Sequence, residues 1–222
     1  MRRARRRLYR PRRGRVLDFL PSGNPLDKHP EHRSKPFIQA LDEDRFKLLE
    51  YNAKFGSSFS IGEKVVFVPL DQRLLNKYYL IGYEDLTKVA QDSLLDVLIQ
   101  LVNEMEKVFV QFFNIAEPIT LRLHAIELLP GIGKRHLQQI LQARRQKPFE
   151  SFEDLEKRGG LKSPQRIIAE RIIKEIQGGE KYYLFAEPPP GSKGLYLNYM
   201  ARLRALVGLD KGNPSESGSE AQ

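Results

Sequence analysis

The segment LLPGIGKRHL, residues 128–137, separates two apolar patterns that each have helical spacing. Proline and two glycines lie between Leu129 and Lys134, where they favour a tight turn. The following segment, residues 134–145, is predicted to form an amphipathic helix. This helix starts with Lys, Arg and His, although each exposed cation near a helix N-terminus costs up to about 1 kcal/mol. A nearby anion would reverse the sign of that cost.

The hairpin has the composition of a phosphate-binding turn. Glycines let the backbone turn sharply and approach a phosphate with no side chain in the way. The N–H groups of the turn and of the first helical turn would then face the anion. The candidate nucleic-acid-binding residues are Gly131, Ile132, Gly133, Lys134 and Arg135, with Ile132 predicted to point inward and anchor the turn. A plain connection between two helices is the alternative interpretation.

A second segment, residues 155–164, looks like a degenerate copy of this hairpin. It has two glycines and an apolar residue before a helix start, but it lacks the Pro-Gly-apolar-Gly pattern. Its candidate phosphate-binding residues are Gly160, Lys162 and Ser163, and a purely structural role is equally open. Residues 119–177 as a whole are predicted to form four short helices, in the order helix, turn, helix, repeated once.

Capping residues mark the boundaries of these helices. The first helix is predicted to end at Leu129. Ser151 precedes the third helix and is followed three residues later by Asp154, much as in a capping box. Ser163 is predicted to cap the fourth helix, with Pro164 at the first helical position.

Residues 14–85 contain short apolar runs separated by turn-rich segments, a pattern typical of a small β-barrel. Five strands would close or nearly close an OB-like barrel. The aromatic side chains Phe37, Tyr78 and Tyr79 would offer a face for stacking unpaired bases. The strands are predicted over residues 16–20, 37–41, 46–51, 65–68 and 78–81.

Residues 86–115 are predicted to form one long connecting helix. Apolar residues recur along it at steps of three and four, at Leu94, Leu98, Leu101, Met105, Val108 and Phe112. Further apolar residues broaden this stripe, which favours a spine between two domains over a strict coiled-coil seam. Formation of a homodimer, or binding of a protein partner, through this helix is a further possibility.

The chain is therefore predicted to be a two-part α+β protein. A five-stranded OB-like barrel would be joined by the connecting helix to an all-α tandem helix-hairpin-helix domain. A strand over residues 181–185 and a helix over 195–207 would follow. The predicted organisation is a disordered Arg-rich arm at 1–13, the barrel at 14–85, the helix at 86–115, the hairpin domain at 116–178, an extension at 179–209 and a disordered tail at 210–222.

The positive charge is concentrated at the amino terminus. Residues 1–15 contain nine Arg and no acid, and 37 Lys and Arg less these nine leaves 28, which equals the 28 Asp and Glu. An arm of this composition would stay extended and bind phosphates in a salt-dependent manner. A transit peptide, a nuclear import signal and an over-extended gene start are the alternatives. The arm residues predicted to contact nucleic acid are Arg2, Arg3, Arg5, Arg6 and Arg7.

The order of four motifs resembles an archaeal family, domain-of-unknown-function family 655. The motifs are GEKVVF, KYYLIGYEDLT, LLPGIGK and SPQRIIAERII, and the resemblance covers residues 14–180. It implies an OB-like barrel joined by a long helix to a tandem helix-hairpin-helix region, and a role in nucleic-acid binding. It implies no reaction, and it does not extend to the Arg-rich arm.

The sequence contains no candidate residues for catalytic or cofactor chemistry. Without Cys, disulfides, thiolate zinc sites and iron–sulfur clusters are excluded. A base-excision glycosylase needs an Asp shortly after the hairpin helix, but the first Asp after Lys134 is Asp154. Leu128 stands where a phosphate-binding P-loop needs Gly. Neither a metal nor a cofactor is predicted.

The histidines and the apolar stretches have ordinary interpretations. His29 and His32 lie in a Pro-rich loop and are predicted to be solvated, while His124 and His136 are single residues on predicted helices. Polar residues interrupt the longest apolar stretch, so no membrane span is predicted and a cytoplasmic protein is expected.

These features together predict a non-enzymatic nucleic-acid-binding protein. RNA is favoured over DNA because the predicted barrel resembles RNA-binding barrels and offers aromatic side chains. A DNA-binding protein of repair or replication is the first alternative. A protein-interaction scaffold, in which the hairpins serve only for packing, is the second.

Overall fold

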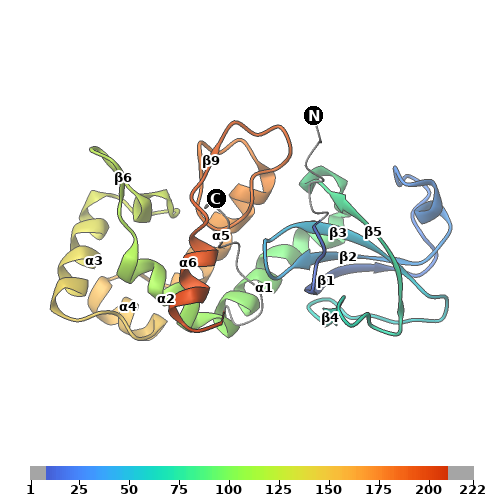
Figure 1. Ribbon diagram of the computed structural model, residues 1–222, viewed down its shortest axis with the longest axis horizontal. Helices are drawn as coiled ribbons and strands as arrows, with labels where there is room; N and C mark the ends of the chain where they lie inside the picture. The colour runs from blue at the N-terminus through green and yellow to red at the C-terminus, as the bar shows by residue number, and fades with distance from the viewer. Residues whose placement is uncertain (1–8, 210–222) are drawn as a thin grey trace, which may run out of the picture.

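The computed structural model describes residues 9–209. Within them, a five-stranded antiparallel half-barrel is followed by a largely helical part with six α-helices (Figure 1). The predicted two-part α+β organisation is confirmed at this level. Five predicted arm residues and the predicted tail lie outside the described residues, namely Arg2, Arg3, Arg5, Arg6, Arg7 and residues 210–222.

The sheet contains five strands in the order β4-β1-β2-β3-β5, and every neighbouring pair is antiparallel. Within residues 9–209, β4 does not pair with β5, so the sheet forms a half-barrel where a closed or nearly closed barrel was predicted. The short strand β4 leads toward Pro69, which has no N–H to donate to a ladder. The strands are β1 (Arg13–Leu20), β2 (Phe37–Asp42), β3 (Leu48–Ala53), β4 (Lys64–Val66) and β5 (Leu74–Ile81).

The two faces of the half-barrel belong to two different apolar cores. Successive side chains of a strand point to opposite faces. Val16 and Leu49 therefore belong to a core inside the half-barrel, whereas their neighbours Leu17 and Leu48 belong to the core of the helices. The second core is continuous from the sheet to the last helix, so the two parts of the chain share it.

The half-barrel begins within the basic run: the last residues of the arm predicted to be disordered already join it, because the Arg12 carbonyl accepts the Phe67 N–H at 2.8 Å. Strand β1 already begins at Arg13, and the Arg15 side chain is buried. Its Nε donates to Glu43 Oε1 at 2.6 Å, and its Nη2 pairs with Glu104. Arg15 thus ties the first strand both to the turn after β2 and to the end of the first helix.

The predicted connecting helix is divided at Met105 into α1 (Lys88–Glu104) and α2 (Glu106–Ile115). Met105 has φ −101° and ψ 22°, outside the helical range. The break lets the apolar side of α1 face β1 and α5, while that of α2 faces α3, α4 and α6. One straight helix would not face both sets of neighbours. The stripe is buried within the chain on both helices.

The helix predicted to end at Leu129 is replaced by two short strands and a 3-10 turn. These are β6 (Pro118–Thr120), β7 (Leu123–His124) and η3 (Ala125–Leu128). Pro118 disfavours a helical conformation at the residue before it, and the next two residues are β-branched. At the start of η3, His124 Nδ1 accepts the Ile126 N–H at 3.2 Å, and Glu127 Oε2 accepts the His124 N–H at 2.8 Å.

The other three helices of this region form where they were predicted. They are α3 (Lys134–Gln146), α4 (Phe152–Gly159) and α5 (Pro164–Gln177). Ser151 caps α4 as expected, because its Oγ accepts the Asp154 N–H at 3.1 Å. Arg158 joins α4 to α3, since its guanidinium pairs with Asp154 and also donates to the Ala143 carbonyl at 3.1 Å.

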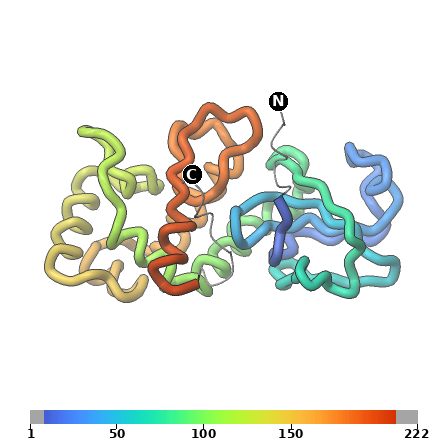
Figure 2. The backbone as a smooth tube through the Cα atoms, in the orientation of Figure 1, coloured from blue at the N-terminus to red at the C-terminus, as the bar shows by residue number. Residues whose placement is uncertain are grey.

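The chain after α5 lies between the half-barrel and helices α3 and α4, orange to red in Figure 2. Strand β8 (Tyr182–Tyr183) pairs in parallel with β9 (Leu195–Tyr196), and α6 (Tyr199–Leu206) follows. The helix predicted over 195–207 begins only at Tyr199, because β9 takes its first residues and Asn198 has a left-handed φ of 47°. Arg204 pairs with Asp44 at 2.9 Å, which attaches this segment to the half-barrel.

A buried ion pair fastens this segment to α5. Glu175 is fully buried and accepts Arg171 Nε at 2.8 Å. Its two oxygens also accept the N–H groups of Leu184, Phe185 and Ala186, at 2.7 to 2.8 Å. One carboxylate therefore satisfies three backbone donors of the extension.

Glu175→Gln is expected to lower the free energy of unfolding by about 3 kcal/mol, because it leaves the buried guanidinium of Arg171 with the partly exposed Glu180 as its remaining carboxylate among residues 9–209. Glu170→Gln on the same helix is the control. It removes a partly exposed pair with Arg166 and should cost less than about 1 kcal/mol. Urea unfolding followed by circular dichroism measures both variants. Equal losses would contradict the role given to Glu175.

Candidate nucleic-acid interface

The first hairpin is a tight turn between η3 and α3. The Leu129 carbonyl accepts the Ile132 N–H at 3.3 Å, with Pro130 and Gly131 between them. Gly131 has φ +76°. This arrangement matches a type II turn, in which proline favours the first central position and glycine the second. The turn itself therefore explains Gly131.

Ile132 lies inward, as the sequence had indicated. Its exposed fraction is 6%, and it packs in the same core as Leu129 and Leu137. The apolar contact fixes the turn against the start of α3. The neighbouring residues Gly131 and Gly133 are left on the surface.

Gly133 is different from Gly131 because the fold does not require a glycine there. Its φ of −97° and ψ of −179° are extended and open to any residue. A β-carbon at this position would meet no atom within 4 Å. Neither conformation nor packing within the described residues accounts for the missing side chain. Close approach of another molecule to the backbone would account for it.

The N-terminus of α3 is open to solvent. Gly133 precedes the helix and has no side chain to cap it. No group among residues 9–209 accepts a hydrogen bond from the backbone N–H of Gly133, Lys134 or Arg135. The three donors lie at the positive end of the helix dipole, which favours an anion.

Lys134 already has an anion beside it. Its Nζ lies 2.8 Å from Glu127 Oε1 and donates to the Arg122 carbonyl at 2.9 Å. Burial raises the pKa of Glu127, but the hydrogen bonds from Lys134 and the His124 N–H outweigh it and hold that pKa below its usual value. An internal carboxylate therefore explains Lys134 at the helix start. The external phosphate that the sequence predicts beside Lys134 is not needed to explain this residue.

Arg135 is the cation of this turn that keeps its charge available. Its side chain is exposed, and it makes no ion pair within residues 9–209. His136 beside it is exposed as well. The site thus combines three backbone N–H groups with one available guanidinium.

The second hairpin repeats part of this geometry. Gly160 has φ +68° and is followed by the buried Leu161, in the same order as Gly131 and Ile132. Here the left-handed φ requires the glycine, because residues with a side chain rarely adopt it. The backbone conformation therefore explains Gly160.

The start of α5 differs more strongly from the start of α3. The Ser163 N–H donates to Glu156 Oε1 at 2.9 Å, so a carboxylate occupies the place of an external anion. Ser163 is the N-cap residue of α5, as predicted, but it has φ +50° and its side chain makes no capping hydrogen bond. Pro164 has no N–H to offer. Lys162 is exposed. These contacts favour a structural role for the second hairpin.

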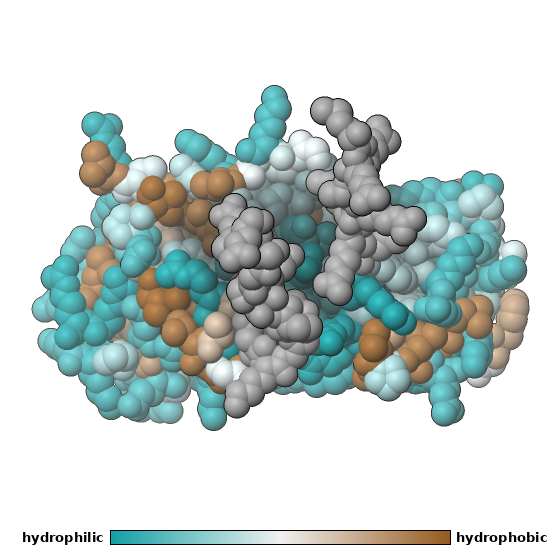
Figure 3. Space-filling view, in the orientation of Figure 1, coloured by the Kyte–Doolittle hydropathy of each residue, from teal (hydrophilic) through white to brown (hydrophobic). Residues whose placement is uncertain are grey.

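The tip between β6 and β7 stands next to the first hairpin. Leu121 is fully exposed there, and the Arg122 carbonyl receives the hydrogen bond from Lys134. In Figure 3 the protrusion at the end where Figure 1 labels β6 carries both hydrophobic and hydrophilic residues. An exposed apolar side chain of this kind is suited to insertion between bases.

The half-barrel does not present the aromatic face that was predicted. Phe37 is fully buried and stacks on His32, with ring centroids 4.2 Å apart. Tyr79 stacks on His29 at 3.8 Å, and the Tyr78 hydroxyl donates to the Tyr9 carbonyl. The side chains proposed for base stacking are thus engaged within the chain.

The prediction of solvated loop histidines is also wrong. His32 is fully buried, and His29 contacts the same carboxylate, that of Glu50. The signal that could have revealed this lies in the spacing of Asp27, His29 and His32. Nothing in the sequence around Glu50 on β3 identifies it as the partner of these histidines.

A half-barrel joined through α1 to two hairpins defines a two-part α+β protein with one solvent-facing helix N-terminus at its first hairpin. The chain belongs to the family described as "Protein of unknown function (DUF655)", whose sequence model matches residues 12–187. Among residues 9–209, no helix combines the length and the hydropathy that a membrane span needs.

Two archaeal proteins are similar over most of their length. The uncharacterized protein MJ0038 of Methanocaldococcus jannaschii is 41% identical over 187 residues, which is 82% of this chain and 82% of that protein. The crystal structure of Af1531 from Archaeoglobus fulgidus, also of family DUF655, matches with a TM-score of 0.72 and 38% identity. That match covers 79% of this chain and 99% of the other.

Alanine at the two hairpin glycines is expected to affect stability differently. Gly131→Ala puts a side chain into a left-handed conformation and should lower the free energy of unfolding by about 1 kcal/mol. Gly133→Ala adopts an allowed conformation in open space and should change it by less than about 0.5 kcal/mol. Urea unfolding measures both. A larger loss for Gly133→Ala than for Gly131→Ala would contradict this geometry.

Proposed function

We propose that the protein binds nucleic acid without catalysing a reaction, and that the first hairpin holds a backbone phosphate. The observation that carries this proposal is the open N-terminus of α3. Three N–H donors without acceptors among the described residues stand there beside Gly133, a glycine that the fold does not require. A phosphate oxygen would accept from these donors, and the helix dipole would favour its charge.

Arg135 supports the same ligand. As the available cation of the first turn, it would add a charge-assisted hydrogen bond to the same or the neighbouring phosphate. Lys134 is neutralised by Glu127, so it contributes chiefly by cancelling the charge of that carboxylate near the site. Recognition would therefore depend mainly on backbone N–H groups.

The fold analogies point in the same direction. The two hairpins resemble the paired helix-hairpin-helix unit, and the half-barrel resembles the OB type. The preference for RNA rested on barrel aromatics that are engaged within the chain. The proposed ligand is therefore a phosphodiester backbone, and duplex RNA and duplex DNA are compared directly. Leu121 favours a duplex with an accessible groove.

The alternative of a protein-interaction scaffold needs an exposed apolar surface on the connecting helices. The apolar stripe of α1 and α2 is buried among the other helices and the sheet. A partner helix would have to bind elsewhere. This favours nucleic-acid binding over a scaffold role for the connecting helices.

Gly133→Val is expected to weaken binding at least tenfold, about 1.4 kcal/mol, because its side chain would occupy the approach to the three N–H groups. Fluorescence anisotropy with labelled duplex RNA, duplex DNA and single strands measures the affinity. The melting temperature should stay near that of the wild type. A folded Gly133→Val that binds as tightly as the wild type would contradict the proposal.

The salt dependence separates the contributions of single charges in the same experiment. Arg135→Gln should reduce the slope of log affinity against log salt by about one. Lys88→Gln removes an exposed cation from the first turn of α1, away from the hairpin, and should leave the slope unchanged. Deletion of residues 1–8 should lower the slope further if the arm contacts phosphates. If the slope is unchanged after that deletion, the arm does not contact phosphates.

A further inference from the structure

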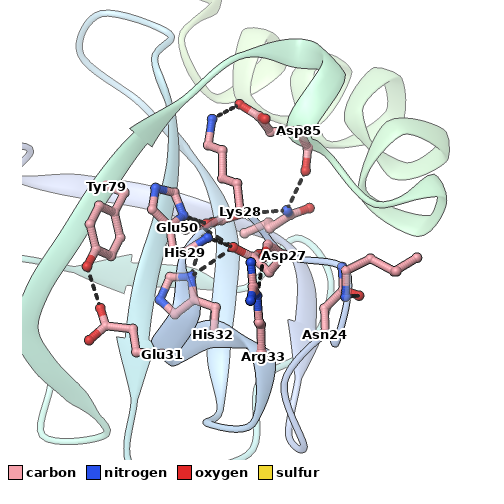
Figure 4. Close-up of polar contacts among 12 residues, drawn as sticks. Asn24, Asp27, Lys28, His29, Glu31, His32, Arg33, Glu50, Tyr79 and Asp85 are labelled. Carbon is pink, nitrogen blue, oxygen red and sulfur yellow. Dashed lines mark hydrogen bonds and ion pairs between the residues drawn. The ribbon is translucent and has the colours of Figure 1, made fainter.

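Four side chains that can bind a metal ion meet beside the half-barrel. Asp27, His29 and His32 come from the loop between β1 and β2, which includes η1 (Pro30–Arg33), and Glu50 comes from β3. One donor atom from each lies within 4.8 Å of all the others. Figure 4 shows the two imidazole rings and the two carboxylates directed toward one another.

Four of the six distances between these donor atoms lie around the separation expected in a tetrahedral metal site. Both imidazole Nδ1 atoms face Glu50 Oε2, at 2.7 Å for His29 and 3.0 Å for His32. The same two nitrogens lie 3.3 and 3.9 Å from Asp27 Oδ1. In a tetrahedron with metal–ligand bonds of about 2.0 to 2.1 Å, neighbouring donor atoms are about 3.3 Å apart. The four distances lie on both sides of this value.

The orientation of His32 points to a lone pair directed into the cluster. Its Nε2 lies 2.9 Å from Asn52 Oδ1. An amide oxygen only accepts hydrogen bonds. His32 Nε2 must therefore carry a hydrogen. In the neutral ring Nδ1 then has a free lone pair beside Glu50 Oε2, and a metal ion between the two would use both.

Neighbouring groups hold the remaining donors in place. Glu50 Oε1 accepts Gln39 Nε2 at 3.0 Å, which leaves Oε2 for the cluster. Asp27 Oδ1 accepts the His29 N–H at 2.7 Å. The two rings are fixed by stacking, His29 on Tyr79 and His32 on Phe37. Metal sites commonly show such supporting contacts around their ligands.

Within residues 9–209, no lysine or arginine pairs with either carboxylate of the cluster. The Asp27 and Glu50 side chains are only 4% and 1% exposed. Among residues 9–209, each of their ion-pair contacts is with His29 or His32. The nearby Lys28 pairs with Asp85, and Arg33 donates to the Asp27 carbonyl. A divalent cation with two neutral imidazoles would balance both carboxylates.

A surface cavity gives a cation access to the cluster. It has a volume of about 260 Å³, and its lining includes Asp27, Glu50, Glu84 and Asp85 against one cation, Lys28. Acidic walls of this kind raise the local concentration of cations.

We propose that Asp27, His29, His32 and Glu50 bind one divalent transition-metal ion, with zinc the best match. Two imidazole nitrogens and two carboxylate oxygens suit zinc, and imidazole ligands disfavour magnesium and calcium. Because four protein groups complete the coordination, the ion would serve structure by fastening the loop after β1 to β3. This proposal is independent of the hairpin and its ligand.

Titration of the chelator-treated full-length protein with Zn²⁺ tests the proposal. Calorimetry should give one ion per chain, and Co²⁺ used as a second probe should show the intense visible absorption of tetrahedral coordination. His29→Gln changes the least buried of the four ligands, and Asp27→Asn replaces a side chain by one of the same shape. Both variants should therefore stay folded. Each is expected to weaken zinc binding at least tenfold.

His136→Gln is the matched control, because this histidine is exposed on α3, apart from the cluster. It should bind zinc like the wild type. The proposal is overturned if the folded wild type takes up no stoichiometric zinc, which would leave the cluster as a hydrogen-bonded network. It is overturned equally if His29→Gln and Asp27→Asn both bind zinc with wild-type affinity.

Discussion

The burial of one apolar stripe, carried by α1 and α2, is the constraint on which the rest of the structure depends. This stripe has to be covered on two sides, and no single element of the chain is large enough to do it. The half-barrel and α5 cover α1, while α3, α4 and α6 cover α2. The break at Met105 turns the stripe from one set of neighbours to the other. Both hairpins owe their positions to this arrangement.

Charged side chains then fix the parts that the apolar core only brings together. Arg15 joins β1 to the end of α1 through Glu104, and to the turn after β2 through Glu43. Glu175 binds three backbone donors of the extension to α5, and Arg204 ties that extension back to Asp44. Such pairs are costly to bury and costly to break, because removal of one partner leaves an uncompensated charge. They specify how the half-barrel meets the helices.

Features set by neighbouring residues could be predicted from the sequence, and those set by distant partners could not. Pro130 and Gly131 predict their own turn, and Ser151 predicts the start of α4. Arg15 looked like one more arginine of a basic arm, because Glu104 is far away in the chain. The loop histidines looked solvated because Glu50 lies on another strand. Their burial depends on tertiary contacts that no local pattern contains.

The same distinction changes the account of the first hairpin. The cations at the start of α3 had suggested a missing phosphate, yet Glu127 satisfies Lys134 from the other side of the turn. The features that favour an anion there are Gly133, the three N–H groups and Arg135. At the second hairpin, Glu156 accepts the Ser163 N–H, so that one protein contains both an open and an internally filled version of the turn.

The most direct test of the central claim is a ¹⁵N NMR titration of the full-length protein with the duplex oligonucleotide that it binds most tightly. If the first hairpin holds a backbone phosphate, the amide signals of Gly133, Lys134 and Arg135 should shift strongly on binding. The Ser163 amide, already bonded to Glu156, should shift little. Saturable binding that leaves the signals of the first three amides unmoved would contradict the account.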